Sequence, residues 1–139
     1  LSIGKDYPLL GVGKSLRNAY IPQYLPEMSQ GNHEIEMWKK NQQEMGILRS
    51  GFPGLGEYTS RFAETGIVGL LIFLLPPGYL VYRLIQSIND KELSKGNILQ
   101  RVFFLISFIA ILTTGIGDML DVFYTYWIML GLGYAMIKF

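Results

Sequence analysis

The sequence predicts an all-α, polytopic membrane protein, with about three spanning helices and an external helical loop region at residues 1–62. Three apolar stretches indicate this fold: Ile67–Ile85 with 19 residues, Val102–Gly117 with 16 and Val122–Ile137 with 16. Arg83 is the only charged residue within them. A spanning helix needs about 20 mostly apolar residues, and apolar neighbours can extend the shorter two. A soluble helical bundle is the alternative, but the remaining polar surface is too small to cover three such helices.

The bulk composition excludes several classes of protein. The chain has 139 residues, of which 50% are hydrophobic and 14% aromatic, with a net charge of +1 and no cysteine. So small a charge gives no reason to expect nucleic-acid binding, and disulfides and thiolate metal sites are excluded. The chain begins at Leu1 without a signal-peptide pattern. We therefore expect a fragment of a longer protein, inactive by itself.

The charged residues of the loops predict how the chain crosses the membrane. The spans are expected near residues 63–86, 98–117 and 120–138, and basic loops tend to stay cytoplasmic. The loop after the first span is basic and the turn after the second is acidic: Arg83, Lys91, Lys95 and Arg101 against Asp118 and Asp121. The acidic turn and residues 1–62 are therefore predicted to be extracytoplasmic.

Residues 1–62 are rich in turn signals, and two helices are predicted between them. The first covers Lys14–Tyr20 and ends near Pro22, because the residue before proline avoids the α region. The second covers Glu34–Leu48, where a stripe recurs at helical spacing. This stripe can pack on other helices or lie on a membrane surface. It is formed by Ile35, Trp38, Gln42, Met45 and Leu48.

A long helix is predicted to start near Glu57 and to run into the membrane. Gly66 and Gly69 are either sites where another helix comes close or simply tolerated glycines. Two consecutive prolines, Pro76 and Pro77, remove two backbone donors, so a kink or break is expected there.

The run Gly11–Ser15 (GVGKS) resembles the end of a phosphate-binding P-loop. A true P-loop needs a further glycine five positions before Gly13, and Pro8 occupies that position. A weaker hypothesis stays open: the backbone amides after Gly13 face an anion such as a pyrophosphate, with Lys14 and Arg17 nearby.

Three further residues are candidates for chemistry. His33 is the only histidine, and it is either a solvated loop residue or a general base. Arg61 and Glu64 are three apart on the predicted helix, just outside the lipid. They form either an ordinary ion pair or a phosphate-binding arginine that Glu64 holds in place. The sequence shows no evident motif of metal-binding residues.

Two motifs together resemble the bacterial O-antigen ligase and O-antigen polymerase superfamily. Tyr7–Gly13 (YPLLGVG) is similar to that family's entry to its large external loop, a proline–leucine run ending in Gly-Val-Gly. Glu57–Leu71 (EYTSRFAETGIVGLL) is similar to the segment that closes this loop and starts the next helix. The order, the separation and the position against the membrane also match. The motifs cover residues 1–75 or so.

The resemblance implies a glycosyltransferase of the bacterial cytoplasmic membrane that uses undecaprenyl-diphosphate-linked glycans, without a cofactor, alongside other polysaccharide-assembly proteins. It implies that arginines of the external loop hold the pyrophosphate and that a histidine before the closing helix is the base. That family histidine falls at about Leu55 in this chain.

The expected mechanism is direct transfer on the outer face of the membrane. An acceptor hydroxyl attacks the anomeric carbon, Arg17 and Arg61 stabilise the leaving diphosphate, and His33 or Glu64 takes the proton. Gly11, Gly13 and Lys14 complete the expected substrate site. Two non-enzymatic alternatives stay open: a transporter segment, which predicts charges lining a path through the membrane, and a membrane scaffold with an external binding region.

Overall fold

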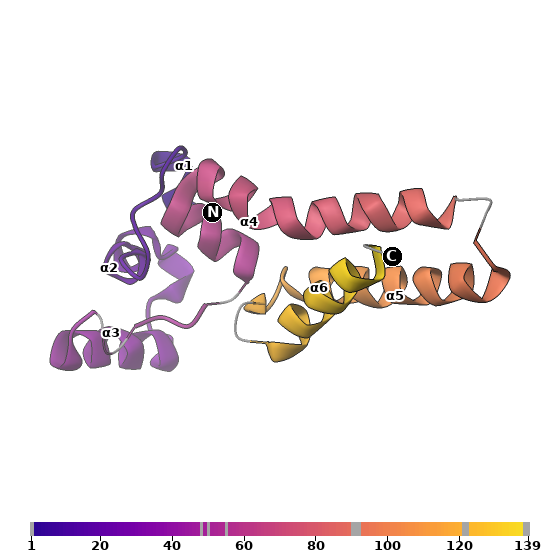
Figure 1. Ribbon diagram of the computed structural model, residues 1–139. Coiled ribbons are helices and arrows are strands. Elements are labelled where there is room, and N and C mark those ends of the chain that lie inside the picture. Colours follow the sequence, from indigo (N-terminus) through magenta and orange to yellow (C-terminus); the bar gives the residue numbers. More distant parts are fainter. Residues whose placement is uncertain are drawn as a thin grey trace. The chain divides into compact units, whose positions relative to one another are not determined.

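A computed structural model describes residues 2–47, 49, 51–54, 56–89, 93–120 and 123–137, and all regular structure among them is helical (Figure 1). The predicted all-α class is therefore confirmed. Contacts divide the chain into two units, Leu1–Leu70 and Leu71–Phe139. The helices are α1 (Ser2–Asp6), α2 (Arg17–Tyr20), α3 (His33–Met45), α4 (Glu57–Ile88), α5 (Lys95–Thr114) and α6 (Tyr124–Ile137), and two 3₁₀ turns, Ile21–Tyr24 and Glu27–Ser29, lie between α2 and α3.

Helix α3 begins and ends where its flanking residues require. The Asn32 side chain accepts hydrogen bonds from the backbone N–H groups of Glu34 and Ile35, which caps the first turn. Gly46 stops the helix with φ 82°. The helix is thus close to the predicted Glu34–Leu48, although Leu48 lies outside the described residues.

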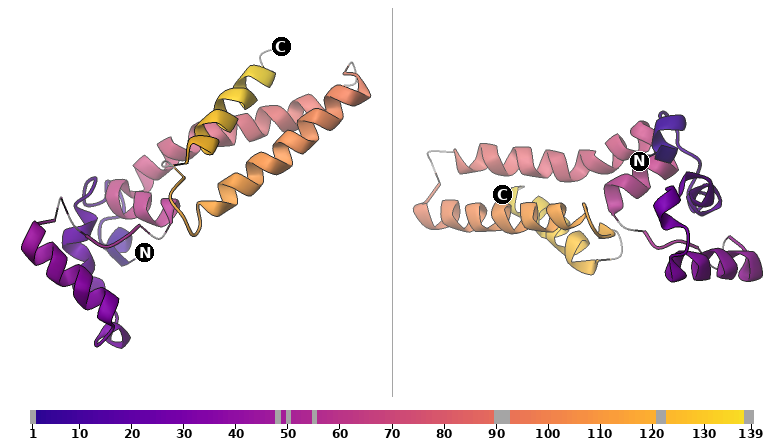
Figure 2. Two further views of the ribbon diagram at one scale, coloured as in Figure 1. Left: turned by 90° about the horizontal axis from the view of Figure 1, so that it is seen from below. Right: turned by 180° about the vertical axis from the view of Figure 1, so that it is seen from behind.

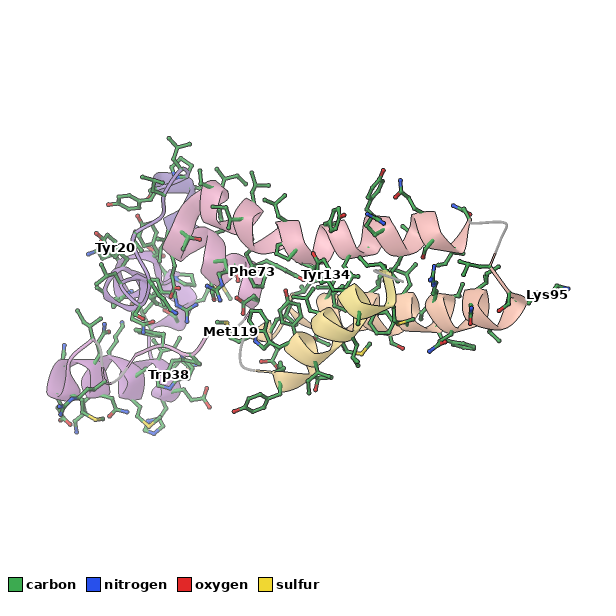
Figure 3. All side chains as sticks on the ribbon, viewed as in Figure 1. Tyr20, Trp38, Phe73, Lys95, Met119 and Tyr134 are labelled. Carbon is green, nitrogen blue, oxygen red and sulfur yellow. The ribbon has the colours of Figure 1, made fainter. Side chains whose placement is uncertain are left out.

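Gln42, the polar residue in the otherwise apolar stripe of α3, has a structural role. The Gln42 side chain donates to the backbone carbonyl of Asn18, at 2.8 Å. Trp38, labelled in Figure 3, meets Phe52 edge-on with ring centroids 5.8 Å apart. These contacts favour packing within the first unit over the membrane-surface interpretation for this part of the stripe.

Helix α2 is shorter than predicted. The expected helix began at Lys14, but residues 14–16 form a turn in which Ser15 has φ 65°. A residue in this left-handed region cannot continue a right-handed helix. Helical structure therefore starts at Arg17, and it passes into a 3₁₀ turn at Ile21 with Pro22 in its first turn.

Helix α4 is interrupted at a glycine and not at its prolines. Gly66 has φ 64° and ψ −165°, which is the only non-helical backbone within α4. Of the kink or break expected at Pro76 and Pro77, the break does not occur, since helical backbone continues through both. The Tyr134 hydroxyl donates to the Pro76 carbonyl at 2.9 Å, so that carbonyl has a partner beyond the helix.

Two helices, α4 and α5, are long and apolar enough to cross a membrane. Only 17% and 6% of their most apolar windows are buried within the chain, whereas the core helix of a soluble protein would be mostly buried. Helix α6 has 14 residues in the described range, fewer than the roughly 17–25 of a typical span. Two of the three expected spans are therefore present as helices of sufficient length.

In the second unit, α6 packs on α5 and on the end of α4 that follows Leu70 (Figure 2). Gly133 makes this packing possible: a Cβ there would lie 2.5 Å from Leu80 and 3.0 Å from Phe104. Phe73 lies 6.2 Å from Tyr126, centroid to centroid, and both Phe73 and Tyr134 are labelled in Figure 3. A small residue at the closest point of approach is typical of helices that pack in membranes.

Candidate functional site

The break in α4 is filled by the segment at residues 8–13. The N–H groups of Val12 and Gly13 donate to the carbonyls of Ala63 and Glu64, at 3.0 and 2.8 Å. In return, the N–H group of Ile67 donates to the carbonyl of Pro8 at 2.8 Å. The N–H group of Val68 donates to that of Leu9 at 3.3 Å. We call these two segments, residues 8–13 and 63–68, the clasp.

The clasp replaces two hydrogen bonds that a continuous helix would make. In an unbroken α-helix, the N–H group of Ile67 would bond to the carbonyl of Ala63, and that of Val68 to Glu64. The non-helical backbone of Gly66 separates these pairs, which leaves two N–H donors and two carbonyl acceptors without a partner in the helix. Residues 8–13 supply a partner for all four, so the break leaves none of these groups unsatisfied.

Two glycines make the close approach possible. A Cβ on Gly66 would lie 2.2 Å from the carbonyl oxygen of Leu9, and one on Gly11 would lie 2.4 Å from the carbonyl carbon of Glu64. Both residues also have φ near +65°, a conformation that favours glycine. Gly66 is therefore approached closely, but the neighbour is the turn that carries Leu9 and Leu10 and not another helix. Gly69 instead faces Thr65 of its own helix.

A polar cluster lies beside the clasp and joins its two segments. The Arg17 guanidinium donates through Nη1 to the Ser60 hydroxyl, and its Nε lies 3.5 Å from Glu64 Oε1. The backbone N–H of Ser15 donates to the same Glu64 oxygen at 3.3 Å. The side chains of Arg17 and Glu64 are each 14% exposed. We call Ser15, Arg17, Ser60 and Glu64 the Arg17 cluster.

One amide after Gly13, that of Ser15, faces an anionic group that the chain itself provides. The sequence pattern suggested that the amides after Gly13 receive a pyrophosphate. In the structure, the Gly13 amide bonds to the backbone carbonyl of Glu64 and the Ser15 amide to its carboxylate. The Glu64 carboxylate therefore occupies the position where an external anion would meet the Ser15 amide and the Arg17 guanidinium.

A second ion pair lies one turn earlier on α4. Arg61 Nε is 2.5 Å from Glu57 Oε1, and the Glu57 side chain is fully buried. The sequence had placed Glu64 beside Arg61, but Glu64 lies beside Arg17 instead. Helical spacing alone does not decide this, because Glu57 and Glu64 are both within reach of Arg61 along the same helix face; Arg17 supplies the partner for Glu64, and Glu57 pairs with Arg61. Arg61 is therefore held in place by Glu57.

The other predicted residues lie apart from this cluster or at its edge. Lys14 is exposed in the turn that precedes Arg17. His33 is exposed at the first position of α3, and no hydrogen bond or ion pair of its side chain occurs within the described part of the chain. The family histidine position at Leu55 lies outside the described residues. Thus Arg17, Glu64, Gly11 and Gly13 come together, while His33 does not join them.

Sequence reasoning missed Glu57, Ser15 and Ser60. Helical spacing could have indicated two of them, because Glu57, Ser60, Arg61 and Glu64 recur at three- and four-residue intervals and thus share one face of α4. Ser60 is buried with 4% exposure, which is unusual for serine outside a hydrogen-bonded site. The role of Ser15 depends on its backbone amide, and no residue type signals that.

A third polar contact fixes the start of the chain beside the 3₁₀ turn at Ile21–Tyr24. The Tyr24 hydroxyl donates to Asp6 Oδ2 at 2.5 Å. This hydrogen bond raises the pKa of Tyr24 to about 12, with smaller contributions from desolvation and from the charge of Asp6. A contact between α1 and this turn helps position the segment that carries Arg17.

The described residues contain no group of three or more His, Asp or Glu side chains that could hold a metal ion. No protein-family model, curated protein or solved structure matches the chain. Functional assignment therefore depends on the site itself.

Proposed function

We propose that the chain is part of a membrane glycosyltransferase that polymerises or ligates undecaprenyl-diphosphate-linked oligosaccharides at the outer face of the bacterial cytoplasmic membrane. One observation carries the proposal. The two segments that resemble the O-antigen ligase and polymerase superfamily, Tyr7–Gly13 and Glu57–Leu71, are hydrogen-bonded to each other through the clasp. Segments far apart in sequence thus form one structural unit, as parts of a common site would.

The location of this unit supports a lipid-linked substrate. The apolar part of α4 begins at Ile67, directly after the clasp, and has the length and composition of a membrane span. A site at this position lies at the level of lipid headgroups when α4 spans the bilayer. A diphosphate attached to a polyprenyl chain would have its charge at the same level.

In this proposal, Arg17 binds the diphosphate. Its guanidinium has five N–H donors in a planar fork that suits phosphate oxygens, and the two contacts described leave donors for a ligand. Lys14 adds an exposed positive charge at the edge of the cluster. Both groups would stabilise the negative charge that develops on the leaving diphosphate, and such stabilisation is a large term in many enzymes.

The reaction is a direct displacement at the anomeric carbon. The acceptor hydroxyl oxygen forms a bond to this carbon while the bond from the carbon to the diphosphate oxygen breaks. Glu64 takes the hydroxyl proton, and the lipid diphosphate leaves with the electron pair. His33 is the alternative base if the external region rearranges around the substrate.

Arg61 is better suited to support the site than to bind the diphosphate. Its guanidinium is paired with the buried Glu57 carboxylate. Replacing Arg61 would therefore leave a buried charge without its partner, which destabilises a fold. Loss of activity after such a change would not distinguish a binding role from a folding role.

The test is the length of glycan chains in cells that carry Arg17→Ala in the full-length protein. Arg49→Ala is the matched control, since Arg49 is an exposed arginine of the same region. The proposal expects short or absent polymer for Arg17→Ala, with normal protein abundance, and normal polymer for the control. Normal polymer from Arg17→Ala would remove the proposed mechanism.

A direct assay separates the enzyme from the transporter and scaffold alternatives. Purified full-length protein is supplied with a lipid-diphosphate oligosaccharide, and release of the lipid diphosphate is measured. The proposal expects release that depends on Arg17. Movement of the lipid across vesicles without release would instead support a transporter. Binding without release or movement would support a scaffold.

A further inference from the structure

The turn at residues 8–11 carries two leucines that the chain itself does not cover. Leu9 is 66% exposed and Leu10 is 74% exposed. No charged residue lies between Asp6 and Lys14. An exposed pair of leucines in an uncharged turn is costly in water, because apolar surface stays hydrated.

The position of this turn indicates what covers it. The backbone of Leu9 and Leu10 lies against Gly66, since a Cβ on Gly66 would meet Leu9 at 2.2 Å and Leu10 N at 2.5 Å. The next residues, Ile67 and Val68, are also exposed and apolar, and they begin the apolar part of α4. The leucines therefore continue the surface of a helix that is apolar enough to cross a membrane.

Part of the backbone of the turn is hydrogen-bonded within the chain, as backbone polar groups in hydrocarbon must be. The carbonyls of Pro8 and Leu9 accept from Ile67 and Val68. Pro8 has no N–H group, and the N–H of Gly11 donates to the carbonyl of Tyr7 at 3.1 Å.

We infer that the turn at residues 8–11 inserts into the lipid bilayer beside the start of the α4 span, with Leu9 and Leu10 among the acyl chains. This inference depends on the proposed membrane location of α4, and it does not depend on the proposed reaction. The depth follows from the length of α4. Helical residues 67–88 extend about 33 Å at 1.5 Å per residue, close to the hydrocarbon thickness of about 30 Å. The turn at the start of this segment would therefore lie shallowly, near the headgroups.

The insertion also has a consequence for the Arg17 cluster. The clasp joins the inserted turn to the backbone of Ala63 and Glu64. Anchoring the turn would hold Glu64, and with it Arg17, at a fixed depth relative to the headgroups. A ligand with a charged group at that depth would then lie level with the Arg17 cluster.

Single-cysteine labelling tests the inference directly: this sequence contains no cysteine, and any cysteine elsewhere in the full-length protein is first replaced with serine. A polarity-sensitive NBD probe is attached to Leu10→Cys in the full-length protein. The protein is reconstituted in vesicles of phosphatidylethanolamine and phosphatidylglycerol. Two control positions are labelled in parallel: Ile106→Cys on α5, and Met28→Cys in the external region, where Met28 is 96% exposed.

The inference expects the Leu10 probe to emit at shorter wavelength than the Met28 probe. It also expects quenching by lipids that carry a doxyl group, more strongly at carbon 5 of the acyl chain than at carbon 12. Iodide in the buffer should quench the Met28 probe and leave the Leu10 probe largely unquenched. Labelling Leu9→Cys repeats the measurement at a neighbouring position, in case one variant folds poorly.

Each other outcome has a distinct meaning. If the Ile106 probe is not quenched by doxyl lipids, the membrane location itself fails, and the inference fails with it. If Ile106 is quenched while Leu10 and Leu9 are quenched only by iodide, the turn lies in water and the inference alone is overturned. An emission shift at Leu10 without doxyl quenching would assign the leucines to a protein partner and would also overturn it.

Discussion

The backbone of Leu9 passes Gly66 so closely that a Cβ on Gly66 would lie 2.2 Å from the Leu9 carbonyl oxygen. Gly66 also has φ 64° and ψ −165°, a combination found almost only in glycine. The close contact with Leu9 and the backbone conformation therefore both require glycine at position 66. This contact holds the two halves of the clasp together.

Replacing Gly66 with alanine is expected to destabilise the fold by about 2 kcal/mol or more, from backbone strain and overpacking together. Gly78→Ala is the matched control in the same helix, because a Cβ there meets nothing within 4 Å. Alanine at that helical position should stabilise by about 0.5–1 kcal/mol. The measurement is SDS-titrated unfolding in micelles, followed by circular dichroism. Equal stability of the two variants would contradict the clasp.

The contact between Arg17 and Glu64 should appear as a coupling energy. In a double-mutant cycle of Arg17→Ala and Glu64→Ala, the two effects are expected to differ from additivity by about 1 kcal/mol, because the groups share one partly buried network. Pairing Arg17→Ala with Glu36→Ala is the control, since Glu36 is exposed on α3. That pair should be additive within about 0.5 kcal/mol. Additivity in both cycles would show that the ion pair contributes nothing to stability.

Glu57→Gln should be far more harmful than the same change at an exposed ion pair. Glu57 is fully buried against Arg61, and removing one charge of such a pair costs about 3–5 kcal/mol. Glu44 pairs with Lys40 at 3.8 Å on the exposed face of α3, where an ion pair contributes about 0.5 kcal/mol or less. Comparing the unfolding free energies of Glu57→Gln and Glu44→Gln tests this difference. A similar loss in both would argue against the buried position of Glu57.

The raised pKa of Tyr24 predicts a pH-dependent contribution to stability. The folded pKa of about 12 lies above the ordinary value of 10.0, so folding favours the neutral phenol. This contribution is complete below pH 10 and is lost as the pH rises toward 12. Absorbance at 295 nm should show a late-titrating component that is smaller by one phenol in Tyr24→Phe. Asp6→Asn should move that titration toward pH 10, because the hydrogen bond to Asp6 is the main cause; an unmoved titration would assign it to another source.

Gly133 should tolerate no side chain where α6 meets its neighbours. A Cβ there would lie 2.5 Å from Leu80, so Gly133→Ala is expected to cost about 1–3 kcal/mol as overpacking. Gly131→Ala is the control on the same helix, with open space around its Cβ position. Unfolding in micelles compares the two. Helix packing different from that described would make both substitutions equally mild.

Local sequence patterns predicted the helical elements well. The capping residue Asn32 and the terminating Gly46 bound α3 near the predicted limits. The apolar runs predicted α4 and α5 as helices of spanning length. These features depend on neighbours in sequence, so propensity, capping and hydropathy carry the information.

The interruption of α4 was predicted at the wrong place. Proline is the stronger local signal, yet the backbone stays helical through Pro76 and Pro77 and breaks at Gly66. The break is stable because residues 8–13 satisfy the exposed backbone groups. These partners lie more than fifty positions away along the chain, beyond the range of a local pattern.

The sequence by itself determined the all-α class, the positions of the two long apolar helices and the presence of charged residues just before the first apolar stretch, which begins at Ile67. Only the tertiary structure decided the partners of those charges: Glu57 for Arg61, and Arg17 for Glu64. The physical reason is that hydropathy and helical period are properties of consecutive residues. The pairing of Arg17 with Glu64, in contrast, requires two distant segments to meet. The backbone hydrogen bonds of the clasp hold these segments together, and glycine at positions 11 and 66, which has no Cβ, allows their close approach.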